Sequence, residues 1–141
     1  MRAFAAVFGN RLARVLITRY NVLAKWLIPA GINRTLTEAE LRAYMAPLST
    51  TRSRLASWVF PKEIVGSRAY LAEVEAGLHR LADKPVLLVW GEADGAFRTP
   101  ERLRLLTYFP THRVCLLPAA KHYIQENAPD EICAAIIESA R

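Results

Sequence analysis

Two polar loops hold the residues of this sequence whose types and spacing best suit chemistry. Residues 91–95 follow one continuous apolar run, and residues 119–123 follow another. The first loop carries Asp94 and the second carries His122. A carboxylate beside an imidazole selects the tautomer of the ring and stabilises its protonated form, so the imidazole can act as a general base near neutral pH. Asp94 and His122 are therefore the candidate acid and base, and Glu92 competes for the acid role.

A hydrolytic enzyme built on such a pair also needs a nucleophile, and the sequence contains no motif for one. No glycine lies in a Gly-x-Ser-x-Gly elbow or in its aspartate or cysteine version. Gly91 and Gly95 come nearest, but Asp94 is one position off the centre of that pentapeptide. Dinucleotide fingerprints, P-loops and His-Glu-x-x-His motifs are also missing from the sequence. The sequence therefore shows at most half of a catalytic apparatus, without its nucleophile.

The candidate residues also have ordinary structural explanations. An aspartate after a strand is usually a turn former or a helix cap, and a single histidine is more often a packed or solvated side chain. We expect His79, within a helix, and His112, in a turn, to lie at the surface. Cys115 and Cys133 have apolar neighbours, which favours two buried thiols over a disulfide or a zinc site.

The elements that must position both loops are two apolar strands. We expect strands over residues 85–90 and 113–117, with a helix over 99–109 between them and a last helix over 129–140. This order makes a parallel pair joined by a crossover helix. In open parallel sheets, ligands bind outside the carboxyl ends of the strands. Both candidate loops follow those ends.

The first 81 residues show helical spacing and no strand. Apolar residues over 12–27 recur at three- and four-residue steps, which indicates one amphipathic helix with a leucine-rich inner face. Thr37 and Glu40 have the spacing of a capping box at the start of a second helix. Two further helices are expected, over 50–60 and over 67–81.

Two continuous apolar strands do not make a complete core. Strands without polar alternation belong inside parallel sheets that are covered on both faces, and an isolated pair is marginally stable. Unpaired strand edges also favour association with another chain. We expect this chain to be the C-terminal part of a larger fold, or to self-associate through its exposed strand edges.

The charge is as uneven as the apolar pattern. The chain is 52% apolar and has a net charge of +6, and residues 1–37 contain basic residues but no acidic one. The net charge therefore belongs to the N-terminal quarter. This pattern argues against a nucleic-acid-binding domain, whose basic patch lies on the folded body. No uncharged apolar run approaches the ~18 residues of a membrane span. We expect a cytoplasmic protein with no nucleic-acid partner and no membrane span.

The sequence around both loops resembles the α/β-hydrolases. Residues 85–94, with Phe97 behind them, are similar to the penultimate strand and acid loop of that superfamily. Residues 113–132 are similar to its last strand, histidine loop and final helix. The run over 122–126 is particularly like that of the haloalkane dehalogenases, and residues 35–44 resemble the helical cap of the same enzymes.

The resemblance implies a partial α/β-hydrolase fold, in which a helical cap is followed by strand, helix, strand and helix. Residues 1–81 would be the cap region, and residues 82–141 would be the C-terminal end of the hydrolase core. Asp94 would be the triad acid, and His122 would activate water against an alkyl-enzyme ester. An aspartate nucleophile would have formed that ester by displacing halide from a small apolar substrate. The resemblance implies that this reaction uses neither a metal nor an organic cofactor. In this family the nucleophile and most of the sheet precede the cap, and Lys121 stands where glycine is usual.

Two other functions stay open at this point. An epoxide hydrolase or an esterase would share the acid and histidine loops, and the residue at the elbow would separate these chemistries. A non-catalytic module would instead bind a partner through its strand edge and its basic first helix. On the dehalogenase interpretation, we expect the chain to be incomplete and inactive alone.

Overall fold

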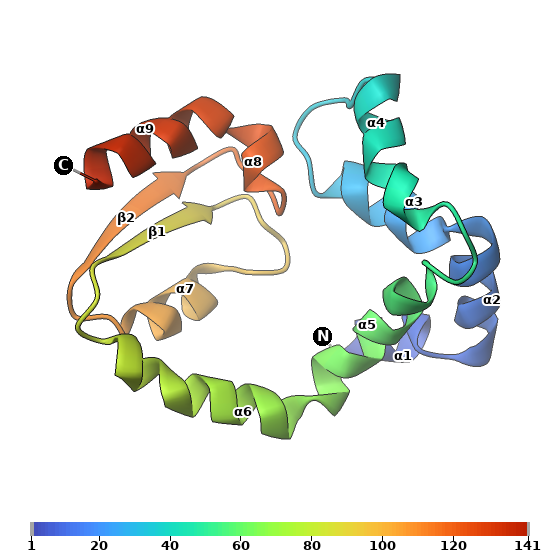
Figure 1. The fold of residues 1–141 in the computed structure, drawn as a ribbon, viewed down its shortest axis with the longest axis horizontal. Coiled ribbons are helices and arrows are strands. Elements are labelled where there is room, and N and C mark those ends of the chain that lie inside the picture. Colours follow the sequence, from blue (N-terminus) through green and yellow to red (C-terminus); the bar gives the residue numbers. More distant parts are fainter. Residues whose placement is uncertain (1, 141) are drawn as a thin grey trace. The chain divides into compact units, whose positions relative to one another are not determined.

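The structure is a computed structural model that describes residues 2–140. Helices precede, separate and follow two strands (Figure 1). In chain order the elements are α1 (Arg2–Phe8), α2 (Arg11–Tyr20), α3 (Val22–Ala30), α4 (Glu38–Met45), η1 (Ala46–Leu48), α5 (Leu55–Gly66), α6 (Arg68–Gly77), η2 (Leu78–Leu81), β1 (Val86–Gly91), α7 (Thr99–Leu106), β2 (His112–Leu117), α8 (Ile124–Asn127) and α9 (Pro129–Ser139). None of the helices within residues 2–140 is long and apolar enough to cross a membrane.

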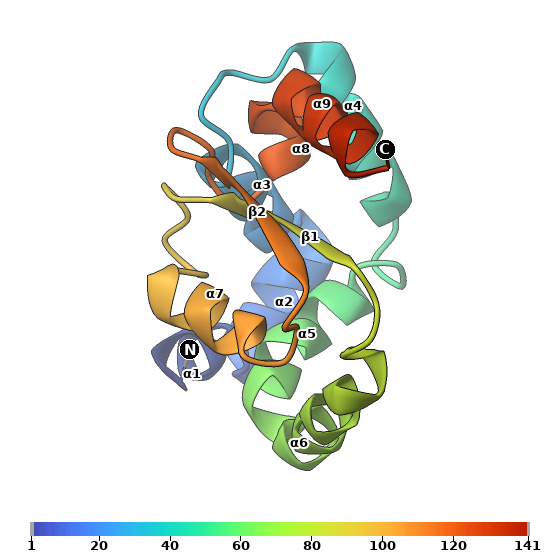
Figure 2. The same cartoon turned by 90° about the vertical axis from the view of Figure 1, so that its left-hand side faces the viewer.

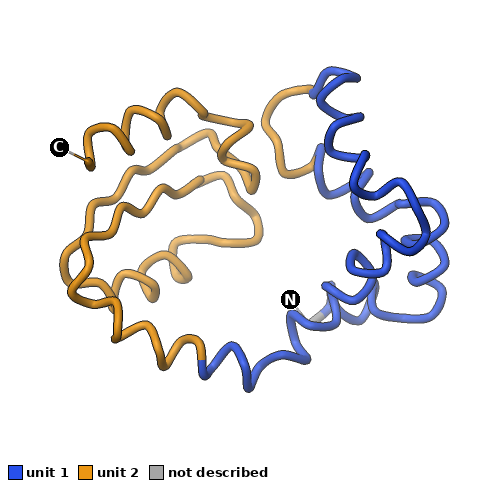
Figure 3. The backbone as a smooth tube through the Cα atoms, in the orientation of Figure 1, with its two compact units in different colours: residues 1–29, 36–73 blue, residues 30–35, 74–141 orange. Residues whose placement is uncertain are grey.

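The chain divides into two compact units (Figure 3). Unit 1 comprises residues 1–29 and 36–73 and is helical where it is described. Unit 2 comprises residues 30–35 and 74–141 and contains both strands. The short segment 30–35, between α3 and α4 along the chain, therefore groups with the strands. A division into a cap region and a core region after residue 81 stays a prediction.

The expected continuous helix over 12–27 is wrong, because Asn21 interrupts it. Asn21 adopts a left-handed conformation with φ of 57°, and its N–H donates a hydrogen bond to the carbonyl oxygen of Ile17. Asparagine is one of the few residues besides glycine that takes this conformation readily, and it commonly ends a helix there. The chain consequently turns between α2 and α3. Helical spacing alone did not reveal the break, because apolar residues continue on both sides of it.

The inner face of α2 also differs from the expectation. The core of unit 1 centres on Ile17, which is 0% exposed, together with Ala13 and Leu23. In contrast, Leu12 is 70% exposed and Tyr20 is 54% exposed. Helix α2 packs against α5 through the face that carries the small side chain of Ala13, because a small residue lets two helices approach closely. The described residues leave Leu12, Leu16 and Tyr20 uncovered, whereas Leu23 of the same stripe is buried.

The capping box at the start of α4 is confirmed, and the expected end of α5 is wrong. The Glu40 N–H donates to Thr37 Oγ1 at 3.3 Å, and the Thr37 N–H donates to Glu40 Oε2 at 2.7 Å. Helix α5 runs through Pro61 to Gly66 rather than stopping before the proline. A proline inside a helix removes one backbone hydrogen bond, but Pro61 is buried. Its apolar packing offsets that loss.

The predicted parallel pair of strands is confirmed in unit 2. Val86 pairs with His112 at one end of the ladder, and Gly91 pairs with Leu117 at the other. Helix α7 connects the two strands along the chain, and α9 packs against both of them. In Figures 1 and 2, α7 and α9 lie on opposite sides of the strand pair. The core of this unit centres on Leu117, Ala120 and Ala128.

Large apolar side chains remain exposed on this narrow sheet. Val114 and Leu116 of β2 are 37% and 40% exposed. The sequence pattern of α9 predicts that Ile132, Ile136 and Ile137 face inward. Ile132 packs against the core, but Ile136 and Ile137 are more than half exposed, so the prediction is wrong for these two residues. A pair of strands is too narrow to cover the whole apolar face of α9. Exposed apolar residues on both β2 and α9 are typical of a sheet that lacks neighbouring strands.

A side-chain contact within unit 2 also joins α6 to α7 and to the residues that follow α7. The Tyr108 hydroxyl donates to Glu75 Oε1 at 2.6 Å, and Arg104 donates to both oxygens of the same carboxylate. The Tyr108 hydrogen bond, with help from Arg104, lowers the pKa of the Glu75 carboxyl. Because this pKa is lower in the folded chain, the contact contributes its full stability above the ordinary pKa of a carboxyl. That stability is lost as the pH falls through the lowered value.

We predict that Ile17→Ala destabilises the helical unit by about 2–5 kcal/mol, because it leaves a cavity in the core. Leu12→Ala on the same helix removes an exposed side chain and should change the free energy of unfolding by no more than about 0.5 kcal/mol. Urea unfolding followed by circular dichroism measures both. A larger loss in Leu12→Ala than in Ile17→Ala would mean that the leucine-rich face is the packed one.

Candidate active site

The two candidate loops lie side by side at the carboxyl ends of β1 and β2. The Ala93 N–H donates to the carbonyl oxygen of Ala120 at 3.1 Å, and the Glu92 N–H donates to that of Leu117 at 3.0 Å. These bonds continue the parallel ladder past its last register pair. The loops are therefore held to each other by their backbones before any side chain takes part.

Gly91 makes this close approach feasible. A Cβ atom at this position would lie 2.6 Å from the carbonyl oxygen of Ala120 and 2.8 Å from that of Lys121. Real Cβ atoms do not come so close to backbone oxygens. A glycine here lets the acid loop and the histidine loop touch.

The structure brings the predicted acid and base together. His122 Nδ1 lies 2.9 Å from Asp94 Oδ2. The second oxygen, Oδ1, accepts the N–H of Ala96 at 2.7 Å. The Asp94 side chain is 10% exposed, whereas that of His122 is 44% exposed. The carboxylate is thus held at both oxygens and largely shielded, while the imidazole stays accessible.

Two aromatic rings complete the surroundings of the imidazole. Phe97 stacks on His122 with ring centroids 5.5 Å apart and an angle of 15° between the planes. Tyr123 meets the ring edge-on at the same distance. Burial raises the pKa of the Tyr123 phenol, which keeps that side chain neutral. With Nδ1 donating to Asp94, Nε2 carries the lone pair, and residues 2–140 offer it no hydrogen-bond partner. This nitrogen is available to accept a proton.

Glu92 does not share this arrangement. It is exposed in the same loop, and its carboxylate forms no hydrogen bond or ion pair with the part of the chain that the structure describes. Only its backbone N–H takes part, in the contact with Leu117. Asp94 is therefore the carboxylate that the geometry selects as partner of His122.

The remaining histidines and cysteines form no second site. His79 and His112 are exposed, as expected, and each ring contacts a carbonyl oxygen of its own neighbourhood. Cys115 is half-buried, and Cys133 is exposed, so the expected burial of Cys133 is wrong. It lies on α9, which the narrow sheet only partly covers. No metal-binding cluster occurs among the described residues.

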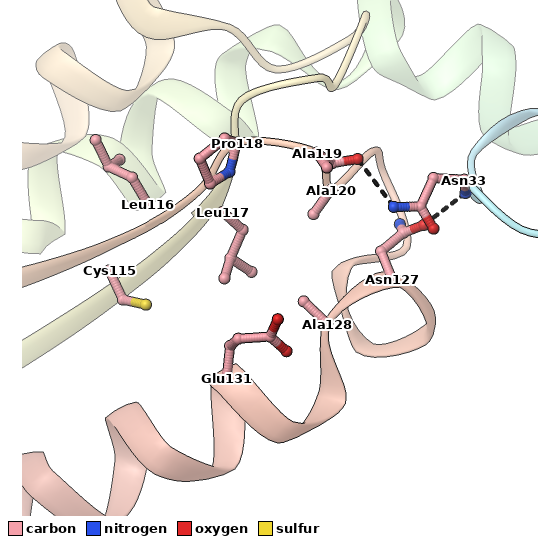
Figure 4. Close-up of a pocket in the computed structure, with 10 residues that line it drawn as sticks. All are labelled: Asn33, Cys115, Leu116, Leu117, Pro118, Ala119, Ala120, Asn127, Ala128 and Glu131. Carbon is pink, nitrogen blue, oxygen red and sulfur yellow. Dashed lines mark hydrogen bonds between the residues drawn. The ribbon is translucent and has the colours of Figure 1, made fainter.

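Hydrogen bonds between Asn33 and the region of the histidine loop were not predicted from the sequence. Asn33 donates to the carbonyl oxygen of Ala119 at 3.0 Å, and its own N–H donates to Asn127 Oδ1 at 2.6 Å (Figure 4). These residues border a pocket of about 250 Å³ that His122 and Asp94 do not line. Residues so far apart in the chain leave no spacing signal, and only the fold reveals their contact.

Known proteins show the same arrangement of elements. No protein-family model matches the chain. Haloalkane dehalogenase 2 from Mycobacterium tuberculosis is 39% identical over 140 residues, which cover 98% of this chain and 49% of that protein. The crystal structure of an ancestral haloalkane dehalogenase matches with a TM-score of 0.82 and 26% identity, over 99% of this chain and 52% of the other. The chain is related to the haloalkane dehalogenases. The resemblance inferred from the sequence and the α/β-hydrolase fold class are thereby confirmed.

The matches cover nearly all of this chain but only part of each related protein. The chain spans about half the length of the curated relatives it matches. A cis-3-alkyl-4-alkyloxetan-2-one decarboxylase from Shewanella oneidensis is also similar, at 28% identity over 89% of this chain and 41% of that protein. The shared half therefore occurs in proteins named for more than one reaction.

We predict that Gly91→Ala destabilises the chain by about 1–3 kcal/mol, because the new methyl group meets backbone oxygens of the histidine loop. Gly95→Ala is the matched control, since a Cβ there has nothing within 4 Å. It should be neutral or slightly stabilising. Thermal melts of both variants test this expectation. A stable Gly91→Ala variant would show that the loops do not approach as closely as described.

Proposed function

We propose that this chain provides the acid and the base of a hydrolase that cleaves carbon–halogen bonds of small apolar haloalkanes. One observation carries the proposal, the 2.9 Å contact between His122 Nδ1 and Asp94 Oδ2 at the carboxyl ends of two parallel strands. Relatedness to haloalkane dehalogenases supports this reaction over the other uses of such a pair.

The chemistry proceeds through an ester in this proposal. A carboxylate nucleophile attacks the carbon that bears the halogen, and halide leaves. Water then attacks the carbonyl carbon of the ester while its proton passes to Nε2 of His122. When the bond between the carbonyl carbon and the alkyl oxygen breaks, that proton goes to the departing alcohol. The nucleophile is then a carboxylic acid, which loses the second proton of the water to solvent and becomes a carboxylate again, so the products are alcohol, halide and one proton. Asp94 stabilises the imidazolium that exists between the two transfers at Nε2.

The surroundings of Asp94 suit that role. Its side chain is nine-tenths shielded from solvent. The attraction between opposite charges is stronger in such surroundings than in bulk water. The Ala96 N–H and the imidazole hold both of its oxygens, so the carboxylate keeps one orientation. The stacked ring of Phe97 limits rotation of the imidazole. Neither group needs to reorganise when the proton arrives.

The nucleophile is the part that these 141 residues do not supply, since no elbow motif occurs among them. We therefore assign it to the half of the related dehalogenases that this chain does not match. The exposed apolar residues of β2 and α9 agree with a sheet that needs further strands. Self-association through strand edges and a cytoplasmic location stay predictions.

A second candidate function is decarboxylation of an oxetan-2-one, the activity for which the Shewanella oneidensis relative is named. The higher identity to a haloalkane dehalogenase favours halide displacement. Epoxide and ester hydrolysis are further alternatives. The identity of the elbow residue and the products formed from each substrate class would separate them.

We predict that the chain alone releases halide from short haloalkanes no faster than its His122→Ala variant. Losing one triad member already costs a complete enzyme several orders of magnitude, and here the nucleophile motif is missing altogether. Ion chromatography of released halide measures both rates. Release by the parent chain alone, abolished in His122→Ala, would reveal a nucleophile within these residues.

The catalytic roles are tested in a complemented protein, in which this chain is joined to the half of the Mycobacterium tuberculosis dehalogenase that it does not match. We predict that His122→Ala stops turnover and traps the alkyl-enzyme ester, because the base serves the second step. Asp94→Asn should reduce turnover on the order of 10³- to 10⁴-fold. Intact-protein mass after substrate addition detects the trapped ester.

Glu92→Gln is the matched control for Asp94→Asn, because it changes a carboxylate of the same loop that does not touch the imidazole. It should keep nearly full activity. A folded complemented protein that forms neither ester nor alcohol would contradict the proposed function. An inactive Glu92→Gln beside an active Asp94→Asn would mean that the other carboxylate is the acid.

A further inference from the structure

The residues on both sides of His122 are tied to one segment from a distant part of the sequence. This segment, residues 30–35, is here called the strap, and it groups with unit 2 (Figure 3). The Tyr123 N–H donates to the carbonyl oxygen of Gly31 at 3.0 Å. Lys121 Nζ donates to the carbonyl oxygen of Ile32 at 3.2 Å. The neighbours of His122 on either side are thus held by consecutive residues of the strap.

Gly31 lets the strap lie directly against these residues. A Cβ atom at this position would come within 2.5 Å of the Tyr123 ring and 3.2 Å of His122 Cβ. The next residue, Ile32, is 2% exposed. The strap is therefore a packed part of unit 2, and it leaves no room for a side chain at Gly31 beside His122 and Tyr123.

Two asparagines extend the contact beyond the histidine itself. Asn127 Nδ2 donates to the carbonyl oxygen of Tyr123 at 2.7 Å, while its Oδ1 accepts the N–H of Asn33. The side chain of Asn33 reaches the carbonyl oxygen of Ala119, as Figure 4 shows. One asparagine pair thereby joins the start of the histidine loop to the end of α8. The segment from 119 to 127 is bound to the strap at several points.

An ion pair secures the far end of the strap. Arg34 contacts Glu126 Oε2 at 2.6 Å and also donates to the carbonyl oxygen of Glu126 at 3.2 Å. None of these contacts lies in the ladder between β1 and β2. These hydrogen bonds of the strap go to the loop that carries the imidazole and to α8.

We propose that the strap positions His122, and that Lys121, Asn33 and Asn127 are positioning residues for the base. This inference rests on the proposed function. Asp94 and Phe97 hold the imidazole ring, but the point from which Nε2 reaches an ester is set by the backbone on both sides of the histidine. Displacement of a reacting group by about 1 Å can cost on the order of a hundredfold in rate.

Lys121→Met in the complemented protein tests this proposal. Methionine keeps an aliphatic stem and removes the donor to Ile32. The rate of ester hydrolysis should fall on the order of tenfold, whereas the rate of ester formation should not change, because the base serves only the second step. The ester should then accumulate during turnover. Rapid mixing with halide detection and quenched-flow mass spectrometry resolve the two steps.

Three further variants separate positioning from general stability. Lys84→Met is the matched control, because Lys84 is exposed in the same unit and its ammonium group has only Asp83 as a side-chain partner in the described chain. It should leave both steps unchanged. Asn33→Ala should slow ester hydrolysis in the same selective way, and Lys121→Arg should restore the rate by supplying a new donor.

The outcomes distinguish this inference from the proposed function. Parent-like ester hydrolysis in Lys121→Met and Asn33→Ala would overturn it, as would an equal fall of both steps, which indicates only loss of folded protein. An unbroken ester in the parent protein would instead contradict the proposed function. In that case the ¹⁵N spectrum of the His122 ring tests whether the strap positions the imidazole. Lys121→Met must still alter the Nδ1–H signal, and Lys84→Met must not.

Discussion

The close backbone contact between two loops at one end of a parallel strand pair is the constraint on which the rest of this structure depends. Gly91 has no side chain, so the carbonyl oxygen of Ala120 can approach it and accept the N–H of Ala93. Only then does a carboxylate on one loop reach an imidazole on the other. The contact between Asp94 and His122 is a consequence of the register of the strands and of one glycine.

The candidate site is held by many contacts, but the sheet beneath it has too few strands to be covered. Asp94 is bound at both oxygens and the His122 ring is stacked, whereas the strands below them leave Val114 and Leu116 exposed. Local hydrogen bonds and ring contacts organise a site without help from distant strands. Burial of a sheet requires layers on both faces. The half-length match to related dehalogenases fits this contrast, because it covers the acid and histidine loops but no elbow.

Lys121 illustrates how a residue that departs from a family pattern can acquire a role. The resemblance to haloalkane dehalogenases implies a glycine at this position, and this chain has a long cation there instead. In the structure its ammonium group reaches the carbonyl oxygen of Ile32 and ties the histidine loop to the strap. The aliphatic stem spans the gap, and the charge meets a backbone acceptor. The departure is thus accommodated by a contact with a segment distant in sequence.

The sequence by itself determined both strands, their parallel pairing, the capping box of Thr37, the candidate base and the loop that carries the two candidate acids. These features depend on neighbouring residues and on the rule that parallel strands end at the same sheet edge. Only the tertiary structure decided that Ile17 rather than Leu12 is buried, that Asn21 breaks a helix, and which carboxylate meets the imidazole. The strap belongs to this second group, because its contacts join residues about 90 positions apart and no periodicity encodes such pairs. The local conformational preference of a segment depends on adjacent residues, whereas the packing between distant segments is determined only when the chain has folded.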